Sequence, residues 1–255
     1  MGWLFGRKVN ARTTPQIPSD MRVYVVGDIH GRHDLLIDVI EKIMDDSARP
    51  PLVPNQRIVF LGDYVDRGPQ SREVIDTLLA LRERALRRGM AITFLRGNHE
   101  AAMLDFISGP AQAAGWLGFG GRAALFSYGV QPPSLDTMSP KALAETAEKL
   151  DKALPPAHRD FLERLELSLG IGDYFFCHAG VRPGVPLDQQ KPEDMLWIRE
   201  PFLSSALDHG QVVVHGHTVV PEPEFYPNRI ALDTGAYATG RLTCMVLSGS
   251  ERRVL

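Results

Sequence analysis

The sequence has little cysteine, no strongly basic block and no long apolar run, and each absence excludes a class of protein. Its 255 residues include only two cysteines, Cys177 and Cys244, so a disulfide framework is excluded and a reducing, cytoplasmic location is expected. The 28 Lys and Arg residues are balanced by 31 Asp and Glu residues, which disfavours nucleic acid as a partner. No run approaches the roughly 18 apolar residues of a membrane span, so none is expected.

Short apolar segments with many β-branched and aromatic residues are predicted to be buried strands. They are residues 21–26, 57–61, 91–95, 174–177, 212–214 and 230–232, and each runs into a polar residue or a glycine next to one. Helical patterns at residues 34–44 and 71–88 separate the first three strands. This alternation predicts an α/β fold, in which ligands collect at the carboxyl ends of the strands.

The domain organisation is predicted to be simple. Residues 1–20 are expected to form a flexible lead-in, and residues 21–255 a single domain. A segment at about 101–166 breaks the strand-helix alternation and contains an Ala/Lys/Glu-rich helical pattern at residues 140–154. We interpret this segment as a variable helical insert over the site, which either forms a lid or only completes the core.

Six polar residues follow the predicted strands and supply carboxylate, amide and imidazole groups. They are Asp28, His30, Asp63, Asn98, His178 and His217. Alone, each is weak evidence for a ligand, because an Asp after a strand is commonly a turn residue and a lone His is more often structural. Together they form a mixture that suits Mn²⁺, Fe or Zn²⁺ without a thiolate.

The motifs around these residues resemble those of the calcineurin-like metallophosphoesterases. They are Gly-Asp-Ile-His-Gly at 27–31, Gly-Asp-Tyr-Val-Asp-Arg-Gly at 62–68, Gly-Asn-His-Glu at 97–100, His-Ala-Gly at 178–180, His-Gly-His-Thr at 215–218 and Asp-Thr-Gly-Ala at 233–236. The Asp-Arg-Gly and Gly-Asn-His-Glu variants are similar to the phosphoprotein phosphatase branch, which includes Ser/Thr phosphatases and bacteriophage lambda phosphatase. The resemblance implies a sandwich of mixed β-sheets flanked by helices.

The resemblance also implies a centre of two divalent metal ions, with Mn²⁺ expected first and Fe or Zn²⁺ as alternatives. In this pattern Asp28 and His30 hold one ion, Asn98, His178 and His217 hold the other, and Asp63 bridges them. A carboxylate has two oxygens and can serve two cations in this way. Whether His215 is a further ligand or only supports one stays open.

Four further residues are predicted to act on the phosphate group. By resemblance, His99 is the general acid and Asp66 orients its imidazole. Arg67 and Arg199 are predicted to bind the phosphate oxygens, because a guanidinium offers paired donors at fixed charge. For Arg199 the alternative is an exposed arginine paired with a neighbouring carboxylate, Glu200 or Asp194.

The predicted activity is hydrolysis of phosphomonoesters by in-line attack of a metal-bridging hydroxide. The substrates implied by the resemblance are phosphoserine and phosphothreonine in proteins, together with small phosphoesters. One alternative is symmetrical diadenosine tetraphosphate hydrolysis, which needs adenine-stacking aromatics such as Trp116, Phe119 or Tyr128, although these are equally plausible core residues. Another is a non-catalytic phosphate-binding scaffold, which the full set of ligand positions argues against.

Overall fold

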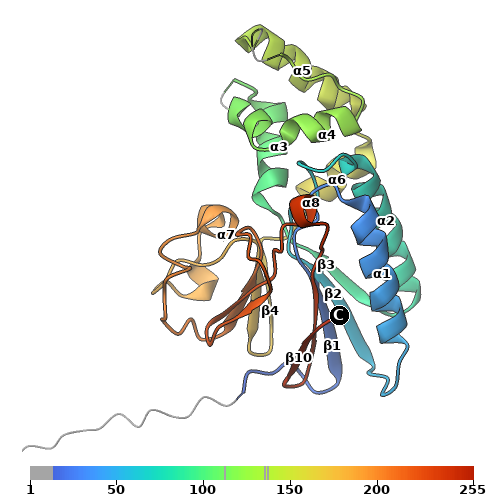
Figure 1. Cartoon of the computed structure of the whole chain (residues 1–255), viewed down its shortest axis with the longest axis vertical. Helices are drawn as coiled ribbons and strands as arrows, with labels where there is room; N and C mark the ends of the chain where they lie inside the picture. Colours follow the sequence, from blue (N-terminus) through green and yellow to red (C-terminus); the bar gives the residue numbers. More distant parts are fainter. Residues whose placement is uncertain (1–13, 112, 135, 137) are drawn as a thin grey trace, which may run out of the picture.

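Two five-stranded sheets pack face to face, with helices on their outer sides (Figure 1). The computed structural model describes residues 14–111, 113–134, 136 and 138–255. The predicted α/β fold with mixed sheets flanked by helices is confirmed.

The first sheet has the order β10-β9-β1-β2-β3. Its strands are β1 (Met21–Val26), β2 (Asn55–Phe60), β3 (Ala91–Phe94), β9 (Cys244–Ser248) and β10 (Glu251–Val254). β1, β2 and β3 are parallel, whereas β9 and β10 form an antiparallel hairpin that pairs with β1. Three neighbouring carboxyl ends therefore lie along one edge of this sheet.

The second sheet has the order β4-β5-β6-β8-β7. Its strands are β4 (Ser168–Ile171), β5 (Tyr174–Cys177), β6 (Val212–His215), β7 (Glu224–Phe225) and β8 (Arg229–Ala231). β5, β6 and β8 are parallel, and the antiparallel strands β4 and β7 form the two edges. Like the first sheet, this sheet contains three neighbouring parallel strands, but here they lie at its centre, whereas β3 forms an edge of the first.

Alternation along β1 separates two apolar cores. Tyr24 and Val26 face the helical side, where they pack with α1 (His33–Ser47) and α2 (Ser71–Arg87). Val23 and Val25 face the second sheet. Because successive strand residues point to opposite faces, this strand is buried on both sides and reads as a continuous apolar run.

The segment at about 101–166 is helical. It follows the start of α3 (Asn98–Ser108) and contains η1 (Ala114–Gly118), α4 (Gly121–Ser127), α5 (Pro140–Ala153) and α6 (Pro156–Glu163). The predicted helix at residues 140–154 corresponds to α5. α3 packs against α5, and α4 against α2, so this helical arm extends the first core beyond the edge of the sheet (Figure 1).

The remaining helices are short and lie near the carboxyl ends of the strands. They are η3 (Leu187–Gln189), α7 (Pro192–Trp197) and α8 (Ala236–Thr239). No helix in the described part of the chain is long and apolar enough to cross a membrane.

The predicted lead-in at residues 1–20 is described only from residue 14, and residues 1–13 lie outside the described part. Residues 14–20 run along the sheets. Ile17 is buried in the core between them, and its N–H donates to the Gly249 carbonyl at 3.0 Å. The Gln16 N–H donates to Asp173 Oδ2 at 3.0 Å.

Candidate metal centre

The six predicted ligands gather where the carboxyl ends of both sheets meet. Asp28 and His30 follow β1, Asp63 follows β2, Asn98 begins α3 after β3, His178 follows β5 and His217 follows β6. The two sheets are joined at this edge through side chains, since Asp28 Oδ2 accepts from the His217 N–H at 2.9 Å. Residues distant in sequence are therefore assembled by the fold itself.

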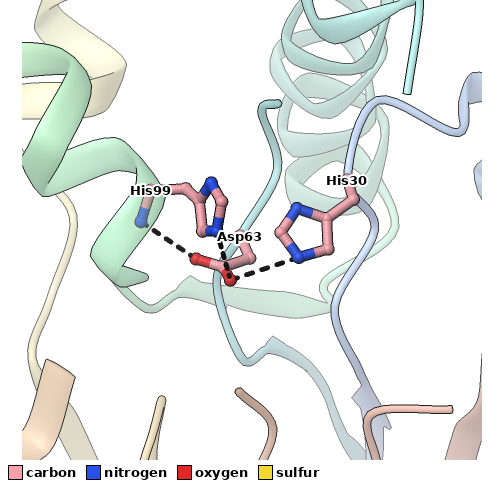
Figure 2. Close-up of side chains that lie close together, drawn as sticks. All are labelled: His30, Asp63 and His99. Carbon is pink, nitrogen blue, oxygen red and sulfur yellow. Dashed lines mark hydrogen bonds and ion pairs between the residues drawn. The ribbon is translucent and has the colours of Figure 1, made fainter. Parts of the chain in front are cut away.

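The carboxylate of Asp63 lies at the centre of the group and faces imidazoles on both sides. Its Oδ2 lies 3.4 Å from His30 Nε2 and 3.8 Å from His99 Nε2, and Figure 2 shows the three side chains converging. Its Oδ1 lies 3.4 Å from His178 Nε2. The 3.4 Å spacings are long for hydrogen bonds but suit two donors that each approach one cation at about 2.1 Å.

A second set of donors converges on Asn98. His178 Nε2 and His217 Nδ1 each lie 2.8 Å from Asn98 Oδ1. Asp63, His178 and His217 form the second of two groups that could hold a metal ion, and the Asn98 oxygen lies against both imidazoles of that group. The first group is His30, Asp63 and His99. Asp63 belongs to both groups, as expected for a bridging ligand.

The imidazoles are held in the state that metal binding requires. His30 Nδ1 lies 3.1 Å from the Val65 carbonyl and His178 Nδ1 lies 2.9 Å from the Leu61 carbonyl, which leaves each Nε2 facing the site. Burial lowers the pKa of His30 well below its usual value, that of His178 to about 3 and that of His217 to about 2. Neutral imidazoles with free lone pairs are metal ligands.

Buried acidic groups give the site an excess of negative charge. Burial first, and then the carboxylates of Asp233 and Asp63, raise the pKa of Asp28 well above its usual value. Burial likewise raises the pKa of Asp233 to about 6. Asp28 Oδ1 is buried and has no hydrogen-bond partner in the described part of the chain. Such an oxygen among close carboxylates fits a cation, so the donor set suits metal ions.

Asp233 is a site residue that sequence reasoning did not select. Its Oδ1 accepts from the Gly235 N–H at 2.8 Å, and its carboxyl group lies beside Asp28. Its position after β8, in the same pattern as the other strand ends, was the signal that could have identified it. Gly216 allows the Asp28 carboxylate to approach the backbone closely, because a Cβ at position 216 would collide with that carboxylate.

Left-handed backbone is concentrated at the centre. Among the described residues other than glycine, positive φ angles occur at His30 (47°), Asp63 (52°), Asp66 (73°), Arg67 (63°) and His217 (63°). Each is a predicted site residue. This conformation costs free energy for residues with a Cβ and persists only where surrounding contacts impose it.

Glu100 makes contacts that hold this backbone in place. It belongs to the Gly-Asn-His-Glu motif, but no role was predicted for it from the sequence. Its carboxylate accepts from the backbone N–H groups of Asp63, Tyr64, Val65 and Gly97, at 2.9, 2.7, 3.2 and 2.9 Å. Glu100 is fully buried. It therefore fixes the loop after β2 against the start of α3, and with it the position of Asp63.

His99 forms a hydrogen-bonded chain with Asp66 and Trp116. His99 Nδ1 lies 2.7 Å from Asp66 Oδ2, and the Trp116 indole N–H donates to the same oxygen at 2.6 Å. Burial lowers the pKa of His99 and raises that of Asp66 well above its usual value, and the Trp116 hydrogen bond opposes the latter. His99 and Asp66 are thus joined by a hydrogen bond in a buried site, and His99 Nε2 faces Asp63.

The two predicted arginines line the cleft above the centre. One NH2 of Arg67 lies 3.3 Å from His99 Nε2, and its guanidinium stacks on the Tyr237 ring at 4.6 Å. The Arg199 guanidinium donates to the His217 carbonyl at 3.4 Å. Asp194, one carboxylate suggested as an alternative partner for Arg199, instead pairs with Arg182. Tyr237, which sequence reasoning missed, also contacts His30 ring to ring at 5.4 Å.

The other histidines lie outside the two metal-ligand groups. The ring of His215 packs against Phe202 at 5.0 Å, and its Nδ1 lies 3.0 Å from the Gly216 carbonyl. His158 is buried between Tyr128 and Asp76.

A cleft of about 970 Å³ opens over the centre. Its lining includes Arg67, Asn98, His99, Arg199 and His217, together with the aromatic side chains of Phe119 and Trp197. Of the aromatics considered for adenine stacking, Trp116 and Tyr128 are buried in the core, and neither lines this cleft. Phe119 lines the cleft, and Trp197, which was not considered, is 44% exposed.

Comparisons with known proteins agree with this geometry. The sequence profile of the calcineurin-like phosphoesterase family matches residues 21–241. The asymmetrical bis(5'-nucleosyl)-tetraphosphatase PrpE of Anoxybacillus flavithermus is 26% identical over 244 residues, covering 87% of this chain and 88% of that protein. The serine/threonine-protein phosphatase 6 catalytic subunit of Caenorhabditis elegans is 38% identical over 93 residues, covering 36% and 25%. A solved structure of a candidate diadenosine tetraphosphatase has a TM-score of 0.61 at 23% identity and covers 92% of each chain.

Proposed function

The chain belongs to the calcineurin-like phosphoesterase family, and from that premise we propose that it is a two-metal hydrolase of dinucleoside tetraphosphates. The observation that carries the proposal is the Asp63 carboxylate, which belongs to two groups of metal-binding side chains at once. Two divalent cations at such a site would leave positive charge available to a phosphate.

The ligand set of this site indicates which ions it would take. Asp28 and His30 would hold one cation, Asn98, His178 and His217 the other, and Asp63 both. When bound, such ions polarise phosphoryl oxygens and lower the pKa of water. Oxygen and imidazole donors without a thiolate suit Mn²⁺, with Fe and Zn²⁺ as alternatives.

The protein's own side chains handle the proton and the phosphate. His99, oriented by Asp66, donates a proton to the oxygen that leaves phosphorus. Arg67 and Arg199 bind the phosphoryl oxygens from the cleft side. The Trp116 N–H donates to Asp66 Oδ2 and thereby holds this carboxylate beside His99. The other oxygen, Asp66 Oδ1, has no hydrogen-bond partner among the described residues.

Similarity over the whole chain supports a nucleotide substrate. The likeness to the tetraphosphatase PrpE covers 87% of this chain, whereas the likeness to the Ser/Thr phosphatase covers 36%. A cleft of about 970 Å³ is also large for a single phosphate group and accommodates a longer ligand. These observations reverse the ranking reached from the sequence, in which phosphoproteins stood first.

Hydrolysis of phosphoserine or phosphothreonine in proteins is the second candidate. It is favoured by the local identity of 38% with the Ser/Thr phosphatase over 93 residues. The same metal ligands and general acid would serve this reaction, because it also breaks a phosphorus-oxygen bond. The candidates differ in what the cleft must accommodate outside the phosphate.

The test compares substrates on one preparation of the full chain. Protein treated with chelator and reloaded with Mn²⁺, Mg²⁺ or Zn²⁺ is assayed with diadenosine tetraphosphate, a phosphoserine peptide and p-nitrophenyl phosphate. We expect no turnover without metal and the highest kcat/KM for the dinucleotide with Mn²⁺. Higher kcat/KM for the phosphopeptide would replace the first candidate by the second, and undiminished turnover after verified metal removal would overturn both.

A further inference from the structure

Two hollows of different character meet at one pair of aromatic side chains. Phe119 and Trp197 line both the cleft over the metal centre and a groove of about 540 Å³ beside it. Their rings lie 6.0 Å apart, edge to face. Trp197 ends α7, which lies beside the second sheet, and Phe119 lies between η1 and α4 in the helical arm that extends beyond the first sheet (Figure 1).

The aromatic pair lies directly beside the reacting centre. The Phe119 ring is 5.0 Å from the ring of His99, and the Trp197 ring is 6.3 Å from that of His217. A nucleobase that stacks on Trp197 would therefore lie close enough to the centre for one sugar to connect it to a phosphorus atom held there.

The two hollows differ in charge. The cleft presents Arg67 and Arg199 beside His99 and His217, together with Lys191, Glu193 and Glu200, while Arg182 there is paired with Asp194. Among the described residues that line the groove, the only charged one is Asp105. A carboxylate repels phosphate but accepts hydrogen bonds, as from the exocyclic amine of adenine. Phosphates thus suit the cleft, and a nucleobase suits the groove.

The groove also has the surface that a base requires. Its walls are Ala102, Ala113, Gly115 and the indole of Trp116, and Trp197 presents a ring that is 44% exposed. Its polar side chains are Asp105 and Ser108. Mostly apolar walls with a few polar groups are typical of small-molecule sites, and stacking on an aromatic side chain is a common way to bind a base.

We propose, resting on the proposed function, that this groove binds the nucleobase of the nucleotide whose phosphorus reacts. The other phosphates and the second nucleoside extend into the cleft along Arg199 and Lys191. Water then adds its oxygen to the α-phosphorus next to the bound nucleoside, and the bond from that phosphorus to its bridging oxygen breaks. His99 donates the proton that the departing nucleoside triphosphate takes, and the products are one nucleoside monophosphate and one triphosphate.

The first experiment measures the contribution of the base. With metal-loaded enzyme, inhibition by adenosine monophosphate is compared with inhibition by ribose 5-phosphate, which lacks the base. We expect the nucleotide to bind about tenfold more tightly, as one stacked base allows. Trp197→Ala should abolish this ratio, Trp197→Phe should largely restore it, and Phe126→Ala, which alters an exposed aromatic on α4, should leave it unchanged. A ratio that survives in Trp197→Ala overturns the base site.

The second experiment follows the oxygen of water. Diadenosine tetraphosphate is hydrolysed in ¹⁸O-water, and the products are examined by mass spectrometry. Label in adenosine monophosphate supports attack at the phosphorus next to the nucleoside whose base is bound in the groove. Label in adenosine triphosphate, or two diphosphates as products, overturns this site of attack. Either of these results with efficient cleavage leaves the proposed function standing. Absence of dinucleotide cleavage together with phosphopeptide hydrolysis would instead overturn the proposed function.

Discussion

Buried carboxylates at the two ends of the first sheet differ in whether their oxygens have hydrogen-bond or ion-pair partners. At the amino end, Asp46 is buried with both oxygens paired: Oδ1 with Arg253, and Oδ2 with the Tyr24 hydroxyl at 2.9 Å. At the carboxyl end, Asp28 and Asp66 are also buried, yet each keeps one oxygen without a partner in the described part of the chain. The carboxyl end also holds the left-handed residues.

The difference shows which end is built for stability and which for chemistry. A paired buried carboxylate stabilises the fold, whereas an unpaired one costs free energy unless a ligand completes it. Unpaired oxygens and strained backbone at the same edge therefore indicate a site that cations complete. Substituting a carboxylate at the carboxyl end should lower activity, and substituting one at the amino end should lower stability.

The largest effect is expected for Asp63→Asn. Because Asp63 belongs to both metal-ligand groups, the change weakens two sites at once, and two losses of about 10² each would lower kcat/KM by about 10⁴-fold. Metal content by mass spectrometry and turnover of p-nitrophenyl phosphate check this. The matched control is Asp46→Asn, which alters another buried carboxylate at the other end of the sheet and should keep the metal content of the wild type. Wild-type metal content with near-normal turnover in Asp63→Asn would remove Asp63 from the bridging role.

The sequence predicted the parallel strands well because they are buried on both faces. β1 has the predicted bounds of residues 21–26, and the helix expected at 140–154 is α5. The strands that were not predicted, β4, β7, β9 and β10, lie outside the two parallel sets. Arg252 and Arg253 make the edge strand β10 look polar, and both are half-buried because Arg252 contacts Tyr174 and Arg253 pairs with Asp46.

The site residues that could be predicted are those whose side chain is a typical metal ligand and whose position follows a strand. Contacts that depend on the path of loops and short helices could not be predicted. All six proposed ligands gather at one edge, as the strand ends required. The Trp116 bond to Asp66 joins residues 50 positions apart through a helical arm whose path no local pattern specifies. Tyr237 on Arg67 and Trp197 beside the cleft are similar cases, because each comes from a short helix that is placed by tertiary packing alone.

The next largest effect is expected for His99→Asn. As general acid, His99 should contribute about 10²–10⁴-fold to kcat, and more for an alkyl phosphate than for p-nitrophenyl phosphate, whose phenolate leaves with little protonation. Both metals should be retained. His33→Asn is the matched control, since His33 contacts Thr77 at 2.9 Å and belongs to neither metal-ligand group. Equal losses for both esters, or loss of a metal, would make His99 a ligand, which its 3.8 Å approach to Asp63 also permits.

A smaller effect is expected for Trp116→Phe, which tests how the helical arm supports the site. The change removes the indole N–H that donates to Asp66 Oδ2 but keeps an aromatic ring in the core. We expect kcat to fall about tenfold with little change in KM, as for other residues that orient a catalytic group through a hydrogen bond. The loss should again be greater for alkyl than for aryl phosphates. A loss that is the same for both would indicate only a packing defect.

The smallest effect on turnover is expected for Asp46→Asn, which should instead lower stability. The hydrogen bonds from Arg253 and Tyr24 lower the pKa of Asp46, although burial opposes them. A lowered pKa means that the stabilisation is present above the unfolded carboxyl pKa of about 4 and is lost as the pH falls through the lower folded-state value. Urea unfolding should therefore show Asp46→Asn less stable than wild type by about 2 kcal/mol at pH 7. The difference should shrink progressively below pH 4, while kcat/KM at pH 7 stays within about twofold, because the partners of the Asp46 carboxylate among the described residues, Tyr24, Arg22 and Arg253, are not site residues. A stability difference that is constant with pH would mean that the carboxylate charge is not what holds this end of the sheet.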